Sequence, residues 1–169
     1  MIKSVRKGNS RAVKLHEVKI NEGGITMGFK LTITGQNTTI QLSEEVIKSV
    51  EVNTSTESSA LAKTNIVATM SVNGKLLSNN KAADDLETEK IFAWSLVPPE
   101  DKDAYRSVTV EIIAASRVPR KIYFPNAFVV DYKEKYIHTD GSGEFFLLLR
   151  QKIDSISAVK SESGSQVEE

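Results

Sequence analysis

KIYFPNAFVVDYKEKYIHTDGSGEFFLLLRQK, residues 121–152, is the stretch that decides the fold. Its apolar and aromatic residues alternate with polar ones, which is typical of half-buried β-strands. We predict a strand that reaches a turn at residues 124–126, a second strand over 127–136, a turn at 139–143 and a third strand over 144–151. The Asp140-Gly141 pair supplies the positive φ angles that a tight hairpin turn needs. The stretch therefore predicts an antiparallel sheet, and none of its residues suggests a chemical site.

The same alternation of apolar and polar residues extends upstream of this hairpin. It predicts strands over residues 13–20, 27–33, 38–42, 46–52, 66–72 and 108–112. Asn73-Gly74 predicts a turn after the fifth of these strands, and the Ser- and Thr-rich residues 53–64 predict an extended loop before it. Together with the hairpin, the pattern amounts to about eight strands, which favours an antiparallel β-sandwich or barrel.

One helix is expected, over about residues 83–96. Asp84 and Asp85 suit a helix N-terminus because the unpaired N–H groups there attract negative charge. The apolar residues that follow have helical spacing, and Pro98-Pro99 ends the segment. Trp94, the single tryptophan, is expected to seal this helix against the sheet.

The two ends of the chain differ in composition from its middle. Residues 1–11 are polar and basic and predict a flexible N-terminal arm, either frayed or docked on a neighbouring subunit. Residues 154–169 are acidic and rich in serine, which predicts a disordered tail. Residues 12–153 between them are expected to form a single β domain.

Composition excludes several classes of function. The 169 residues carry 22 basic and 22 acidic side chains, so no net charge holds the chain on nucleic acid or on an anionic membrane. There is no cysteine, hence no disulfide, thiolate metal site or cysteine nucleophile. The longest apolar run, residues 145–149, is too short to span a bilayer, and the N-terminus has no signal-peptide pattern. We expect synthesis inside the cell.

The residues that could carry chemistry lack partners at the required spacing. His16 and His138 are the only histidines, and neither has a second histidine near it in sequence at metal-binding spacing. Ser142 lies between two glycines, but in a hairpin turn and not between a strand and a helix. Aromatic and basic residues interleave in the hairpin as they do on surfaces that stack single-stranded nucleic acid, although core packing explains these rings equally well. We therefore expect neither an enzyme nor a cofactor.

The stretch IYFPNAFVVDYKEKY with DGSGEFFLLLRQK resembles the C-terminal part of phage-tail-like proteins of Gram-positive bacteria. Trp94-Ser95-Leu96-Val97-Pro98, Tyr105-Arg106 and residues 109–112 fit the same pattern, so that the resemblance covers about residues 58–152. Some of those proteins carry a label that mentions a membrane-associated protease. This sequence has no nucleophile, metal site or membrane span to match that label. More broadly, the chain resembles phage tail-tube proteins and the tube protein of type VI secretion.

The resemblance implies a structural, self-assembling subunit of a phage tail or phage-derived contractile injection particle. In those families hexameric rings stack into a tube, which a sheath can surround and through which DNA passes at most as cargo. It implies assembly from the bacterial cytoplasm, with no membrane partner. The residues expected at the subunit interface are Thr54, Glu57, Leu61, Lys63, Tyr136, Glu144 and Phe146. Two alternatives stay open: a baseplate or tube-initiator ring, and a monomeric β-sandwich binding module.

Overall fold

A computed structural model describes residues 26–56, 65–76, 82–139 and 141–166. In these ranges the chain forms nine strands, one α-helix and two short 3₁₀ helices, which confirms the prediction of a mainly β fold with one flanking helix. In chain order the elements are β1 (Met27–Thr34), β2 (Thr39–Leu42), β3 (Ile47–Thr56), β4 (Ile66–Leu76), α1 (Ala82–Ser95), η1 (Lys102–Ala104), β5 (Arg106–Ala114), β6 (Arg117–Ile137), β7 (Ser142–Gln151), η2 (Ile153–Ala158), β8 (Lys160–Glu162) and β9 (Ser165–Gln166).

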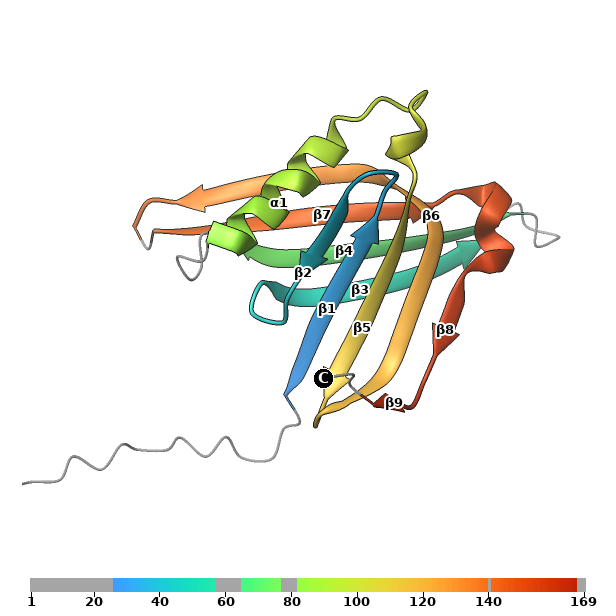
Figure 1. The fold of residues 1–169 in the computed structure, drawn as a ribbon, viewed down its shortest axis with the longest axis horizontal. Coiled ribbons are helices and arrows are strands. Elements are labelled where there is room, and N and C mark those ends of the chain that lie inside the picture. Colours follow the sequence, from blue (N-terminus) through green and yellow to red (C-terminus); the bar gives the residue numbers. More distant parts are fainter. Residues whose placement is uncertain (1–25, 57–64, 77–81, 140, 167–169) are drawn as a thin grey trace, which may run out of the picture.

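The strands form one continuous antiparallel sheet that folds over on itself. Their order is β2-β1-β5-β6-β7-β4-β3, with β8 and β9 attached to β6. Figure 1 shows β1, β2 and β5 running across the direction of β3, β4 and β7. We call β2, β1, β5 and the first half of β6 the first layer, and the second half of β6 with β7, β4 and β3 the second layer. Since β2 and β3 do not pair, the sheet is sandwich-like and does not close into a barrel.

Strand β6 joins the two layers, and here the predicted turn at residues 124–126 is wrong. β6 is continuous from Arg117 to Ile137; its first half pairs with β5 and its second half with β7. Ala127 belongs to both pairings, opposite Arg106 of β5 and Gln151 of β7. The Asn126 carbonyl accepts a hydrogen bond from the Lys152 N–H at 2.8 Å. Pro125 has no N–H to leave unpaired where the strand changes partners, so the proline marks a change of layer and not a reversal of the chain.

Asn73-Gly74 is likewise not a turn. Both residues lie within β4, where they pair with Phe146 and Phe145 of β7. A β-carbon on Gly74 would overlap the ring of Phe145, so the glycine makes room for a core aromatic. β4 forms a hairpin with β3. At the other end of this hairpin β3 extends to Thr56, so residues 53–56 of the predicted loop are strand.

The C-terminal residues are ordered where the composition predicts a disordered tail. η2, β8 and β9 follow β7, and β8 pairs with residues 121–123 of β6 while β9 pairs with residues 117–118. Composition alone could not reveal this, because the segment is held by backbone pairing with a strand edge and by only two apolar side chains, Ile156 and Val159, packed against the core. The predicted N-terminal arm and the predicted strand over 13–20 lie outside the described residues, as do residues 57–64.

The core lies between the two layers and under the helix. α1 confirms the predicted helix within one residue at each end, and Trp94 is buried as expected. The helix packs beside β2 and against β6. The largest buried apolar side chains come from both layers and from α1: Leu31, Ile33, Ile40, Leu42, Met70, Ile91, Trp94, Phe124, Phe145, Leu147 and Leu149. Alternate residues of β7 point into this core, as period-two patterning requires.

Candidate functional site

The second layer has two strand edges that no described strand covers. β3, at one end of the layer, pairs only with β4. The second half of β6, at the other end, pairs only with β7 over residues 128–137. Each edge presents backbone N–H and C=O groups that could accept another strand. Both edges belong to the same layer, at its opposite ends.

The edges of the first layer are covered from within the chain. β8 and β9 cover the first half of β6 on the side away from β5. At the other end of the layer, α1 lies beside β2, and the Gln41 N–H donates to Glu87 Oε2 at 2.6 Å. Open edges are usually blunted in folded proteins, and among the described residues they are blunted in the first layer only. The asymmetry makes the second layer the candidate assembly surface.

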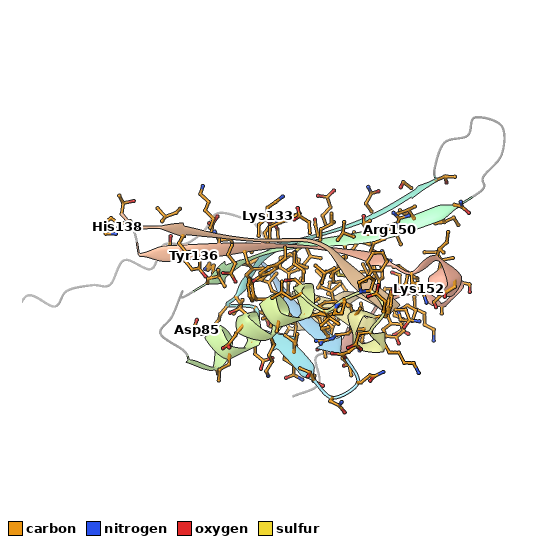
Figure 2. All side chains as sticks on the ribbon, turned by 90° about the horizontal axis from the view of Figure 1, so that it is seen from above. Asp85, Lys133, Tyr136, His138, Arg150 and Lys152 are labelled. Carbon is orange, nitrogen blue, oxygen red and sulfur yellow. The ribbon has the colours of Figure 1, made fainter. Side chains whose placement is uncertain are left out.

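The outer face of the second layer is largely polar. Figure 2 shows this face edge-on, with Lys133 and Arg150 above the sheet and α1 below it. Lys133 pairs with Asp131 at 2.5 Å and lies 5.4 Å from the ring centroid of Phe146. Lys48 of β3 pairs with Glu144 of β7 across β4. Exposed pairs of this kind contribute little to stability, and they leave this face compatible with solvent or with a polar partner.

The described interface candidates all lie on the second layer. Thr54 is exposed on the edge strand β3, and Tyr136 is 61% exposed on the edge strand β6. Glu144 and Phe146 point outward from β7, between those two edges. The candidates Glu57, Leu61 and Lys63 lie outside the described residues. The structure thus brings four of the seven into one layer, and whether they touch a second subunit stays a prediction.

Two tyrosines and one glutamate stiffen the free end of β6. Glu134 accepts hydrogen bonds from the Tyr132 hydroxyl at 2.7 Å and the Tyr136 hydroxyl at 2.5 Å. Burial, together with the adjacent carboxylate, raises the pKa of Tyr132 well above its usual value. For Tyr136 the hydrogen bond to Glu134 is the main cause of a raised pKa. Both hydroxyls therefore stay protonated as donors and fix the orientation of the two rings.

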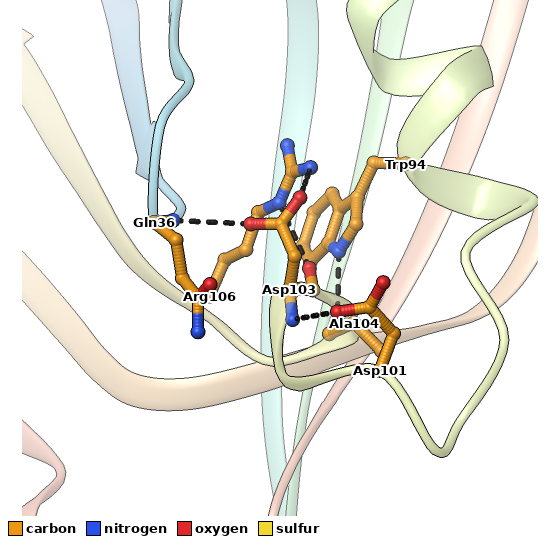
Figure 3. A network of polar contacts seen from close by, with 6 residues as sticks. All are labelled: Gln36, Trp94, Asp101, Asp103, Ala104 and Arg106. Atoms are coloured by element: carbon orange, nitrogen blue, oxygen red, sulfur yellow. Dashed lines mark hydrogen bonds and ion pairs between the residues drawn. The ribbon is translucent and has the colours of Figure 1, made fainter.

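A buried polar network ties the helix to the first layer (Figure 3). Arg106 is buried, and its guanidinium lies 5.2 Å from the ring centroid of Trp94. It donates to Asp103 Oδ2 at 2.5 Å, and the other oxygen of Asp103 accepts the Gln36 N–H at 3.0 Å. Trp94 Nε1 donates to the carbonyl of Ala104 at 3.0 Å. The network fixes the β1–β2 turn, η1 and the end of α1 relative to one another.

The ionisation of Asp103 matches this role. Partial burial acts to raise the pKa of its carboxyl group, but the hydrogen bonds from Gln36 and Arg106 outweigh burial and lower the pKa below its ordinary value. The charged carboxylate balances the buried guanidinium, as a buried ion pair requires. Helical spacing in the sequence predicted the position of Trp94, but no sequence signal singled out Asp103 or Arg106, because nothing in a polar connector shows which of its charges will be buried.

The described residues offer no cluster of metal-binding side chains. They contain no group of three or more histidine, aspartate or glutamate side chains that could hold a metal ion. His138 is exposed at the tip of the β6–β7 hairpin, as the sequence predicts. Within the same residues, no helix is both long and apolar enough to cross a membrane.

Comparison with known proteins finds likeness in structure only. No protein-family model and no curated protein matches the sequence. Hcp1 from Flavobacterium johnsoniae is similar at a TM-score of 0.48 and 13% identity, over 82% of this chain and 99% of that chain. Hcp1 from Salmonella typhimurium is similar at a TM-score of 0.48 and 10% identity, over 83% of this chain and 99% of that chain. A chain of the tube-terminating cap of the anti-feeding prophage is similar at a TM-score of 0.46 and 10% identity, over 79% of this chain and 88% of that chain.

Proposed function

We propose that the chain is a structural, self-assembling subunit that forms a ring of a tail tube, in a phage tail or a phage-derived contractile injection particle. The observation that carries the proposal is the pair of open strand edges at opposite ends of the second layer. The sequence resemblance gives the proposal its biological setting. Of the residues that carry it, 122–136 fall on β6 and 142–151 fall on β7, the strands at the centre of the sheet.

The two edges suit a head-to-tail contact. β3 of one copy can pair with the second half of β6 of the next copy, so that the contact uses two different surfaces of each chain. Such a contact closes into a ring when the rotation between neighbours divides a full turn, and the second layers then form one continuous sheet around the ring. Ring closure leaves no open edge in that sheet. Six copies per ring is the number that the sequence resemblance implies.

The polar outer face of the second layer would give the ring a hydrophilic surface. In a closed ring this face lines the lumen or faces a surrounding sheath protein, and DNA passes at most as cargo. The mixture of Lys133, Asp131, Glu144 and Arg150 gives the face no dominant charge that would hold nucleic acid. We propose no catalytic role. Assembly would start from chains made in the bacterial cytoplasm.

Solution mass and negative-stain images of the purified protein test the proposal. We expect rings, alone or stacked into tubes. Stacks indicate the tube role, and isolated rings indicate the baseplate or initiator alternative. A protein that stays monomeric at micromolar concentration, with no rings on the grid, would contradict assembly and leave the monomeric binding module.

A matched pair of variants tests the edges directly. Thr54 lies on β3 opposite Ala68, on the inner side of the edge strand. In Thr54→Lys an inward-pointing charge at the edge should block strand addition and give monomers. Thr39→Lys places the same charge on the exposed position of β2, in the first layer, and should still form rings. If Thr54→Lys assembles like the wild type, β3 is not the contact.

A further inference from the structure

A groove of about 280 Å³ opens between α1 and the end of the β6–β7 hairpin. Leu76, Phe92 and Tyr136 line it with apolar surface, which we call its floor. The carboxyl groups of Asp85, Glu89 and Glu134 lie around it. Among the described residues that line it, none is a lysine or an arginine. In Figure 2, Asp85 and Tyr136 lie at the same end of the molecule, opposite Arg150 and Lys152.

The walls of the groove are held in place by contacts outside it. Phe92 meets Tyr132 edge to face, with ring centroids 6.1 Å apart. Glu134 is fixed by the two tyrosine hydroxyls, and Thr88 donates to the backbone carbonyl of Asp85 at 2.9 Å. Phe92 is nevertheless 48% exposed and Tyr136 61% exposed, so apolar surface remains uncovered inside an acidic rim. A preformed surface of this kind lowers the cost of ordering on binding.

The chemistry of the groove selects its occupant. An aromatic floor with carboxylates at the rim fits side chains with an aliphatic stem and a cationic head, which are lysine and arginine. Because the groove is concave, these side chains must come from a protruding or extended segment. The apolar floor also favours apolar residues spaced between the charges.

The chain itself contains a segment with this pattern, in residues 1–20. Its basic side chains are Lys3, Arg6, Lys7, Arg11, Lys14 and Lys19, against the single acidic residue Glu17. Val13 and Leu15, then Val18 and Ile20, alternate with polar residues and would pack on the floor. We propose that residues 1–20 of a neighbouring copy dock in the groove between α1 and the β6–β7 hairpin.

The neighbouring copy is the source because of where the groove lies. Glu134 and Tyr136 belong to β6, whose open edge meets the next subunit in the proposed ring. The next copy therefore borders the groove, and the inference rests on the proposed self-assembly. The 26 residues before β1 reach about 85 Å when extended, at roughly 3.3 Å each, which is enough to cross a subunit boundary.

Photocrosslinking in mixed assemblies tests this contact. Protein carrying Phe92→p-benzoylphenylalanine at natural isotope abundance is assembled with ¹⁵N-labelled wild-type protein and irradiated. Mass spectrometry of the digest should show peptides from residues 1–25 of the ¹⁵N copy joined to the crosslinker peptide. The control Tyr123→p-benzoylphenylalanine, on the first half of β6, should not capture them. Capture of unlabelled residues 1–25 only, or of another segment, overturns the proposal.

A charge reversal tests why the segment binds. Glu89→Lys at the rim should lower the crosslink yield severalfold, and Lys14→Glu with Lys19→Glu in the donor copy should restore part of it. Glu100→Lys, exposed outside the groove, should leave the yield unchanged. Rings that form without the crosslink overturn the docking but leave the proposed function in place. Absence of both rings and crosslink overturns both.

Discussion

Asp103 holds the buried guanidinium of Arg106 through Oδ2 at 2.5 Å, while its other carboxylate oxygen accepts the backbone N–H of Gln36. The arginine side chain is only 5% exposed, so its charge has little access to water. One carboxylate therefore neutralises a buried cation and pins the β1–β2 turn at the same time.

Replacing this carboxylate should be costly. In Asp103→Ala the guanidinium stays buried without a counter-charge, and we expect the free energy of unfolding to fall by about 3 kcal/mol. Urea denaturation followed by Trp94 fluorescence measures the change, since the indole packs under the same arginine. Asp154→Ala, which removes an exposed ion pair with Lys152, is the control and should leave the free energy of unfolding nearly unchanged. Equal losses in the two variants would contradict this account.

The same pair predicts an acid dependence of stability. The pKa of Asp103 is lowered in the folded state from an ordinary value of 3.8. The stability that the charged Asp103 carboxylate contributes is therefore fully present above the ordinary pKa of 3.8. This stability is lost as the pH falls through the lower pKa of the folded state. The difference in stability between the wild type and Asp103→Asn should be constant at neutral pH and shrink below about pH 4. Denaturation midpoints of both proteins across this pH range measure the difference in stability. A difference that does not change with pH would show that the charge of the Asp103 carboxylate does not stabilise the fold.

Gly74 predicts an overpacking effect. A β-carbon there would collide with the Phe145 ring and also lie 3.0 Å from the Val46 carbonyl oxygen. We expect Gly74→Ala to destabilise the protein by about 2 kcal/mol, because the buried ring must move within a packed core. Ser71→Ala, on the outer face of the same strand, should change the stability by less than about 0.5 kcal/mol. Thermal unfolding of both variants decides; a neutral Gly74→Ala would mean that the ring repacks freely.

Local patterns in the sequence were sufficient for most single elements. Alternation predicted β1, β2, β4, β5 and β7, and the acidic start with the Pro-Pro stop predicted α1. These signals succeed because burial on one face imposes a period within the element itself. Pro125 and Gly74 misled the prediction because their usual meaning is a turn. Here each residue is explained by a contact with a segment distant in sequence. Near Pro125 the pairing of β6 changes from β5 to β7, and the Phe145 ring occupies the space beside Gly74.

The candidate surfaces were less accessible to sequence reasoning. The hairpin was expected to contact a subunit, but the groove joins α1 to β6 across more than 40 residues, and no local pattern shows that Glu89 and Glu134 will line the same groove. The covering of one sheet edge by β8 was missed for a related reason. Its three residues are all exposed, so they carry no apolar signal, and they are held by backbone pairing with β6 and by the side-chain bond from Arg120 to Ser161.

Removal of residues 159–169 should change how the protein associates. β8 and β9 cover the first half of β6, and Arg120 Nη1 donates to Ser161 Oγ at 2.9 Å. Truncation exposes a third open edge, in the first layer, in addition to the two edges that the proposed ring uses. We expect irregular aggregates beside rings, seen as light scattering that grows with concentration and as branched material in negative stain. The single variant Ser161→Ala removes only the side-chain bond and should assemble as the wild type does. If the truncated protein forms rings as clean as those of the full chain, β8 and β9 do not protect the edge of β6.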